Sequence, residues 1–205
     1  MVCLRKKSKI ELFERAINRF LAGFNLRLIR TQSFQNFMRY ARIASKRKLL
    51  QDRELPISGL QFSKCLESSS QLGQDIFALV ESGFKTHGFF VEFGAGNGVR
   101  DSNTLLLEKE FGWDGILCEP IESEFRELEK NREVKLHNIA VWKKNGKVDF
   151  RVAKRSGLST IQGFESSDNH LTSRLRGSEL VKVDAMTLNE VLIHSNAPQA
   201  IDYLS

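Results

Sequence analysis

The chain has 205 residues and a mass of 23.4 kDa, with 41% hydrophobic, 9% aromatic and 27% charged residues, a composition that excludes collagen-like, low-complexity and wholly disordered proteins. Its positive charge is concentrated at one end: residues 1–50 hold 13 of the 31 Lys and Arg but 2 of the 25 Asp and Glu, whereas the other 155 residues hold 18 and 23. The sequence therefore predicts a basic arm followed by a mildly acidic domain of ordinary size.

Residues 1–50 form this basic arm, and its apolar residues recur at steps of three and four. Such steps predict one helix over residues 9–30 and a second over residues 34–50. The helices are expected either to dock on their own domain or a partner, or to lie as a basic amphipathic surface on an anionic membrane. Nucleic-acid binding is not indicated, because neither an aromatic stacking array nor a known reader motif accompanies the charge. No stretch approaches the roughly 18 apolar residues of a membrane span.

A linker is expected over residues 51–70, where a proline, a glycine and three consecutive serines occur. The main domain then covers residues 71–205. It opens with a helix over residues 71–84, which Gly83 closes. A short aromatic and β-branched run over residues 88–93 predicts the first strand of a buried sheet.

Strands and helices alternate after this first strand. The expected helices cover residues 103–111, 122–131 and 187–193, and the expected strands cover residues 115–118, 134–141, 147–152, 180–183 and 201–204. Residues 156–176 are polar and predict a loop region with some helix. The alternation predicts an α/β fold with a doubly wound, mostly parallel sheet that carries helices on both faces.

The three cysteines, Cys3, Cys65 and Cys118, form no CxxC pair. We expect free thiols in a reducing compartment, with Cys118 buried, and hence a cytoplasmic protein that at most lies at the periphery of a membrane. The four histidines show no metal-ligand spacing, so no metal site is expected.

A glycine-rich turn with Gly94, Gly96 and Gly98 follows the first strand. Alternating glycines permit a sharp turn and let a ligand approach the backbone closely. In a doubly wound sheet this turn lies at the carboxyl ends of the strands, where ligands bind. The spacing departs from the dinucleotide fingerprint GxGxxG, because Val99 occupies the place of the third glycine.

Two acidic residues end neighbouring strands. Glu92 lies two residues before the first glycine, where a carboxylate would repel a pyrophosphate but would suit a ligand with an ammonium group. Glu119 ends the next strand, 21 residues beyond Gly98, a distance at which an acid can accept hydrogen bonds from both ribose hydroxyls. These features together suit S-adenosylmethionine, which joins an adenosine to an amino acid and has no pyrophosphate.

Six short motifs extend this pattern over residues 68–205. They are QLGQD at 71–75, FVEFGAGNG at 90–98, DSNT at 101–104, ILCEP at 116–120, NIAV at 138–141 and IDYL at 201–204. The ordered set resembles the FkbM family of S-adenosylmethionine-dependent methyltransferases. The resemblance implies a Rossmann-like class I methyltransferase that alkylates a hydroxyl oxygen of a sugar or a natural product, and it leaves the basic arm unexplained.

The resemblance also implies roles in cofactor binding for nine residues. Glu92, Gly94, Ala95 and Gly96 would surround the methionine part, Glu119 would hold the ribose, Asn138 and Ala140 would lie near the adenine, and Gln74 and Asp75 would close over the cofactor. A hydroxyl acceptor also benefits from a general base. The candidates for this base are His170, Asp168 and Asp149, in or beside the polar segment after the third strand.

Two other functions stay open at this point. One is a nicotinamide-dependent oxidoreductase on a similar sheet, against which Glu92 and the missing third glycine argue. The other is a non-catalytic binding module in which the basic arm, attached to a membrane, is the functional part. The family pattern continues beyond residue 204 with an acidic segment and further strands, so we also expect a chain truncated at its C-terminus.

Overall fold

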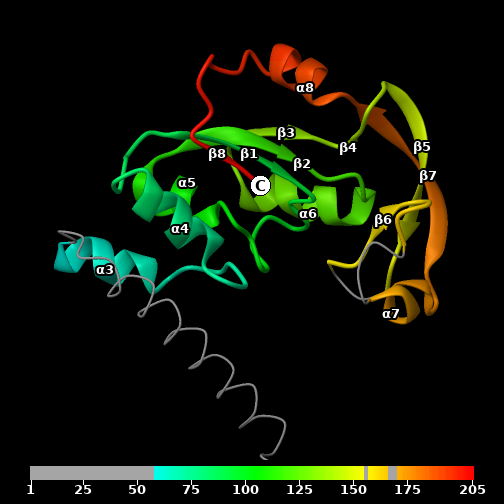
Figure 1. Cartoon of the computed structure of the whole chain (residues 1–205), viewed down its shortest axis with the longest axis horizontal. Coiled ribbons are helices and arrows are strands. Elements are labelled where there is room, and N and C mark those ends of the chain that lie inside the picture. The colour runs from blue at the N-terminus through cyan, green and yellow to red at the C-terminus, as the bar shows by residue number, and fades with distance from the viewer. Residues whose placement is uncertain (1–57, 155–156, 166–169) are drawn as a thin grey trace, which may run out of the picture. The chain divides into compact units, whose positions relative to one another are not determined.

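The computed structural model describes residues 58–154, 157–165 and 170–205, all of which belong to the compact unit Ser45–Ser205 (Figure 1). The expected basic arm lies outside the described residues. The helices are α3 (Gly59–Cys65), α4 (Gln74–Glu81), α5 (Leu105–Phe111), α6 (Glu122–Asn131), α7 (Leu171–Leu175) and α8 (Leu188–His194). The strands are β1 (Phe89–Phe93), β2 (Asp114–Cys118), β3 (Lys135–His137), β4 (Ala140–Val141), β5 (Gly146–Val152), β6 (Thr160–Ile161), β7 (Glu179–Met186) and β8 (Tyr203–Leu204).

The first sheet is parallel and has the strand order β3-β2-β1-β8. Its two central strands, β1 and β2, are buried over nearly their whole length. Burial on both faces explains why both read in the sequence as continuous apolar runs rather than as an alternation of apolar and polar residues. The predicted strands over residues 88–93 and 115–118 are confirmed, and the predicted range 201–204 holds the two-residue strand β8.

Helices cover both faces of this first sheet. Helices α4, α5 and α6 lie on one face, and α8 lies on the opposite face (Figure 1). Because side chains alternate along a strand, Phe90 packs in the core with α4 and α5, whereas its neighbour Val91 packs in a second core with Val191 of α8. Cys118 is a free thiol and is buried in that second core, as predicted.

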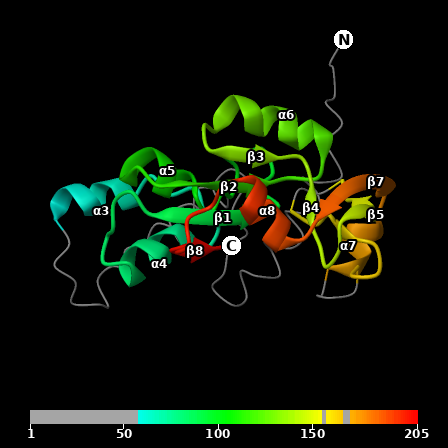
Figure 2. The ribbon, with the colours of Figure 1, turned by 90° about the horizontal axis from the view of Figure 1, so that it is seen from above.

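The second sheet has the order β4-β7-β5-β6 and is mixed. Strand β7 pairs antiparallel with β5 over seven residue pairs and parallel with β4. Figure 2 shows this sheet, with α7, beside one end of the first sheet. We expected strands at β5 and β7, but not that they would form a sheet of their own.

The third predicted strand is wrong as a single element. The structure divides residues 134–141 into β3, which pairs with β2, and β4, which pairs with β7 of the second sheet. Strand β2 ends at Cys118, opposite His137, so the chain beyond His137 has no partner in the first sheet. Asn138 and Ile139 carry the chain from one sheet to the other.

The range expected to be a linker contains helix α3. Ser58 and Gln61 form a capping box, in which the Ser58 hydroxyl accepts from the Gln61 N–H and the Gln61 side chain accepts from the Ser58 N–H. This reciprocal pair satisfies two backbone donors at the start of the helix. Phe62 and Cys65 then pack on the core beneath α4 and α5, so residues 58–65 are part of the domain. None of the helices within the described ranges has the length and hydrophobicity needed to cross a bilayer.

Candidate functional site

A cavity of about 510 Å³ opens between the first sheet and the second. The carboxyl ends of β1 and β2, the glycine turn and residues 100–103 form one side. Val141, Phe150, Thr160 and Ile161 of the second sheet form the other side. Strand ends of a parallel sheet are where ligands bind in open α/β folds.

Glu92, at the end of β1, is buried beside this cavity and is only 4% exposed. One carboxylate oxygen accepts the Thr104 hydroxyl at 2.6 Å, and the other accepts the Asn103 N–H at 3.3 Å. Burial raises the pKa of Glu92 above its ordinary value, because a buried charge is poorly solvated, and the two hydrogen bonds partly oppose this rise. The side chain is a suitable partner for a cationic group.

Glu119 follows β2 and is also 4% exposed. The Gly96 N–H and the Ile121 N–H each donate to one of its carboxylate oxygens at 2.8 Å. Burial raises the pKa of Glu119, and the two backbone donors oppose the rise. The acid thus fixes the glycine turn against the end of β2 and still presents lone pairs to the cavity, which it lines.

The three glycines of the turn have different surroundings. All have positive φ, between 56° and 79°. A Cβ on Gly94 would meet nothing within 4 Å, and one on Gly96 would meet only a Glu124 oxygen at 3.9 Å, so the backbone there is open to the cavity that both residues line. A Cβ on Gly98 would lie 2.5 Å from Leu128 and 2.7 Å from Arg132. Gly98 therefore serves packing against α6, not ligand approach.

Asn103 lines the cavity and carries an unpaired buried acceptor. Its side-chain Nδ2 donates to the Ser205 hydroxyl at 2.9 Å, whereas its buried Oδ1 has no hydrogen-bond partner. Among the described residues this is the one buried side-chain N or O atom without a partner. An orphaned buried acceptor is costly, so a ligand that donates a hydrogen bond is favoured beside Glu92.

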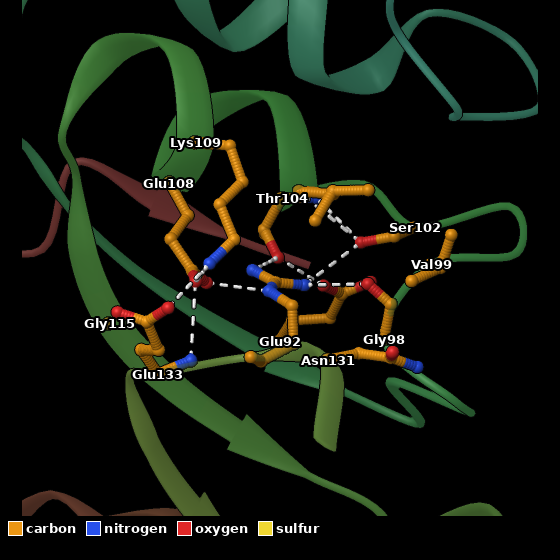
Figure 3. Close-up of polar contacts among 12 residues, drawn as sticks. Glu92, Gly98, Val99, Ser102, Thr104, Glu108, Lys109, Gly115, Asn131 and Glu133 are labelled. Carbon is orange, nitrogen blue, oxygen red and sulfur yellow. Dashed lines mark hydrogen bonds and ion pairs between the residues drawn. The ribbon is translucent and has the colours of Figure 1, made fainter. Parts of the chain in front are cut away.

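Behind the turn lies a buried polar network centred on Arg132, the residue after α6. Figure 3 labels four of its partners and neighbours, Gly98, Ser102, Thr104 and Glu108. The Arg132 guanidinium donates to Glu108 at 2.5 Å, to the Gly98 carbonyl at 3.1 Å, to Ser102 at 3.2 Å and to Thr104 at 3.0 Å. Thr104 in turn donates to Glu92, so the network reaches the cavity wall.

The comparison with known families agrees with this geometry. The family described as the methyltransferase FkbM domain matches residues 92–205, more than half of the chain. The chain belongs to the FkbM methyltransferase family. None of the curated proteins matches it significantly. The resemblance seen in the sequence is thus confirmed, and a methyltransferase implies a methyl donor.

The FkbM methyltransferase brings together seven of the nine residues expected at its cofactor. These seven line the cavity: Gln74, Glu92, Gly94, Ala95, Gly96, Glu119 and Ala140. Asp75 does not line it, because its carboxylate is fully buried and accepts hydrogen bonds from Ser68, Ser70 and the Ile76 N–H. Asn138 does not line it either, because its Nδ2 donates to the Glu119 carbonyl. Both residues support the cavity from outside.

The two expected general bases that the structure describes, Asp149 and His170, do not line the cavity. Asp149 points away from it, because it alternates along β5 with Phe150, which lines the cavity, and it pairs with Lys182 at 2.9 Å. His170 precedes α7, is exposed and is absent from the lining. Asp168 lies outside the described residues.

Three residues of the site were not predicted from the sequence. Asn103 and Thr104 stand in the DSNT motif, but nothing in their spacing showed that they face Glu92. Arg132 gave no signal at all, since it is one arginine in a charged helix end. Within the described ranges, no group of three or more His, Cys, Asp or Glu is arranged to hold a metal.

Proposed function

We propose that the chain is a class I, Rossmann-like methyltransferase that uses S-adenosylmethionine to methylate a hydroxyl oxygen. The parallel sheet with strand order β3-β2-β1-β8 and helices on both faces supports the doubly wound arrangement. The observation that carries the proposal is the pair of buried acids, Glu92 and Glu119, on either side of an open glycine turn.

The residues around the cavity fit the groups of S-adenosylmethionine. The ammonium would bind at Glu92, which offers a carboxylate, and at Asn103 Oδ1, which lacks a donor. The ribose hydroxyls would bind at Glu119, and the adenine would lie against Ile139 and Ala140 at the start of the second sheet. When bound, the cofactor supplies a methyl group activated by a sulfonium. Gly94 and Gly96 let the ligand lie against the backbone.

The second-sheet side of the cavity is left for the methyl acceptor. Val141, Phe150 and Ile161 are apolar, and Thr160 offers a hydroxyl, a lining compatible with a sugar or a natural product. These residues would orient the acceptor oxygen for in-line attack and keep water away from it.

Asp101 is a further candidate for the base that takes the proton of the acceptor hydroxyl. The residue lines the cavity, on the segment that follows the glycine turn. Asp101 has a φ of +55°, a conformation that non-glycine residues adopt more often at functional sites than elsewhere. We therefore assign the general base to the Asp101 carboxylate.

The family match favours this function over a nicotinamide-dependent oxidoreductase, which none of these observations supports. A cytoplasmic location and a contact of residues 1–50 with a membrane surface remain predictions from charge and cysteine content. Residues 1–50 lie outside the described residues, and the fold does not bear on the cellular location.

Calorimetric titration of the full chain with S-adenosylmethionine tests the proposal. We expect saturable binding, and we expect Glu119→Ala to weaken it by about 1–3 kcal/mol, because the ribose hydroxyls lose their acceptor. Glu122→Ala is the matched control, since that exposed glutamate pairs with Arg126 on α6 and lies outside the cavity. Equal affinities of the Glu119→Ala and Glu122→Ala variants would contradict the ribose assignment.

A further inference from the structure

Arg132 is a buried charge that the proposed reaction does not use directly. Its side chain is 0% exposed, although arginine is rarely buried without a specific partner. Glu108, at 8% exposure, supplies the opposite charge. The remaining donors of the guanidinium reach three oxygens on the chain between the glycine turn and α5.

One of these contacts fixes the direction of a second hydrogen bond. A guanidinium can only donate, so Thr104 Oγ1 must accept from Arg132 Nη2. A hydroxyl has a single hydrogen, and that of Thr104 is then directed to Glu92 Oε2 at 2.6 Å. Figure 3 draws Thr104 and Glu92 in the same cluster of polar contacts. Arg132 therefore donates to Thr104, and Thr104 donates to Glu92.

We propose that Arg132, acting through Thr104, is a positioning residue that keeps Glu92 ionised and aimed at the ammonium group of the cofactor. This inference rests on the proposed function, because it names what prepares the amino-acid end of that same site. It gives the buried arginine a role beyond joining α5 to α6.

The charges around Glu92 show why such support is needed. Burial opposes ionisation, and the charge of Asp75 on α4 also raises the pKa of Glu92. Tyr203 of β8 faces the same region and is neutral, since burial raises its pKa above the ordinary value. Only Arg132, the Thr104 hydroxyl and the Asn103 N–H favour the ionised carboxylate among the described groups near it. Loss of one of them raises the pKa of Glu92, so ionisation is lost at a higher pH than in the wild type.

The test is the pH dependence of S-adenosylmethionine binding by the full chain, measured by calorimetry between pH 5.5 and 7.5. Thr104→Val removes the hydroxyl that links Arg132 to Glu92, while Arg132 keeps its hydrogen bonds to Glu108, the Gly98 carbonyl and Ser102. Thr104→Ser keeps the hydroxyl and is the control. We expect Thr104→Val to bind about tenfold more weakly than the wild type at the lowest pH, with the deficit shrinking as pH rises, because the lost hydrogen bond is one to a charged group. Thr104→Ser should follow the wild type.

A structural role alone would give a different result. It would lower the melting temperature and weaken binding equally at every pH, and that result would overturn the inference. So would a Thr104→Val variant with the pH profile of the wild type, or a Thr104→Ser variant that behaves like Thr104→Val. If Thr104→Val does not melt cooperatively, Thr104→Cys, with a weak donor of similar size, takes its place. Failure of the wild type itself to bind would instead contradict the proposed function.

Discussion

Glu92 and Glu119 are equally buried but are held by different kinds of donor. Two backbone N–H groups bind Glu119, so its position follows from the path of the main chain. Glu92 depends on one backbone N–H and on a threonine hydroxyl that a buried arginine orients. Since a buried carboxylate is costly without partners, side-chain substitutions should affect the Glu92 end of the site more than the Glu119 end.

The turn glycines should also differ when each is replaced by alanine. Gly98→Ala places a Cβ against Leu128 and Arg132 at a positive φ, and we expect it to lower the free energy of unfolding by about 3 kcal/mol. Gly94→Ala meets open space and carries only the backbone strain, about 1 kcal/mol. Urea unfolding of both variants measures the difference. Similar losses for the two would show that Gly98 is not a packing position.

At the scale of elements, α5 and α6 are joined by one buried ion pair, between Glu108 and Arg132. Glu108→Ala leaves the guanidinium buried without its counter-charge, and we expect a loss of about 3–5 kcal/mol in the free energy of unfolding. Glu127→Ala, which breaks an exposed pair with Lys130 on α6, should cost at most about 1 kcal/mol. Chemical denaturation measures both losses. Equal stability of the two variants would show that the Glu108–Arg132 ion pair does not hold α5 and α6 together.

Strand β5 shows how an element can be predicted while its orientation is not. Its residues were recognised as a strand, but either Asp149 or Phe150 could have faced the site. The pairing of β5 with β7 decides this, because it places Phe150 opposite Val181 toward the cavity and Asp149 opposite Lys182 outside it. A strand has two faces, and only its partners select the inner one.

For the molecule as a whole, the features set by local sequence were predictable. The central strands, helices α5, α6 and α8 and the glycine turn follow from short local patterns. Glu92 was found from its place before the first glycine, and Glu119 from its place 21 residues beyond Gly98. The features that were not predictable depend on distant partners: β4 leaves the first sheet because β7, more than forty residues later, is available to it. In the same way, the burial of Arg132 follows from the meeting of α5 with α6.

The central claim is that the amino-acid end of S-adenosylmethionine lies between Glu92 and Asn103 and its ribose beside Glu119. A crystal structure of the full chain grown with the cofactor tests this most directly. We expect the ammonium within hydrogen-bond distance of the Glu92 carboxylate and Asn103 Oδ1, with the ribose hydroxyls on Glu119. An empty cavity at saturating cofactor, in crystals where a pyrophosphate nucleotide occupies the same turn, would contradict the account.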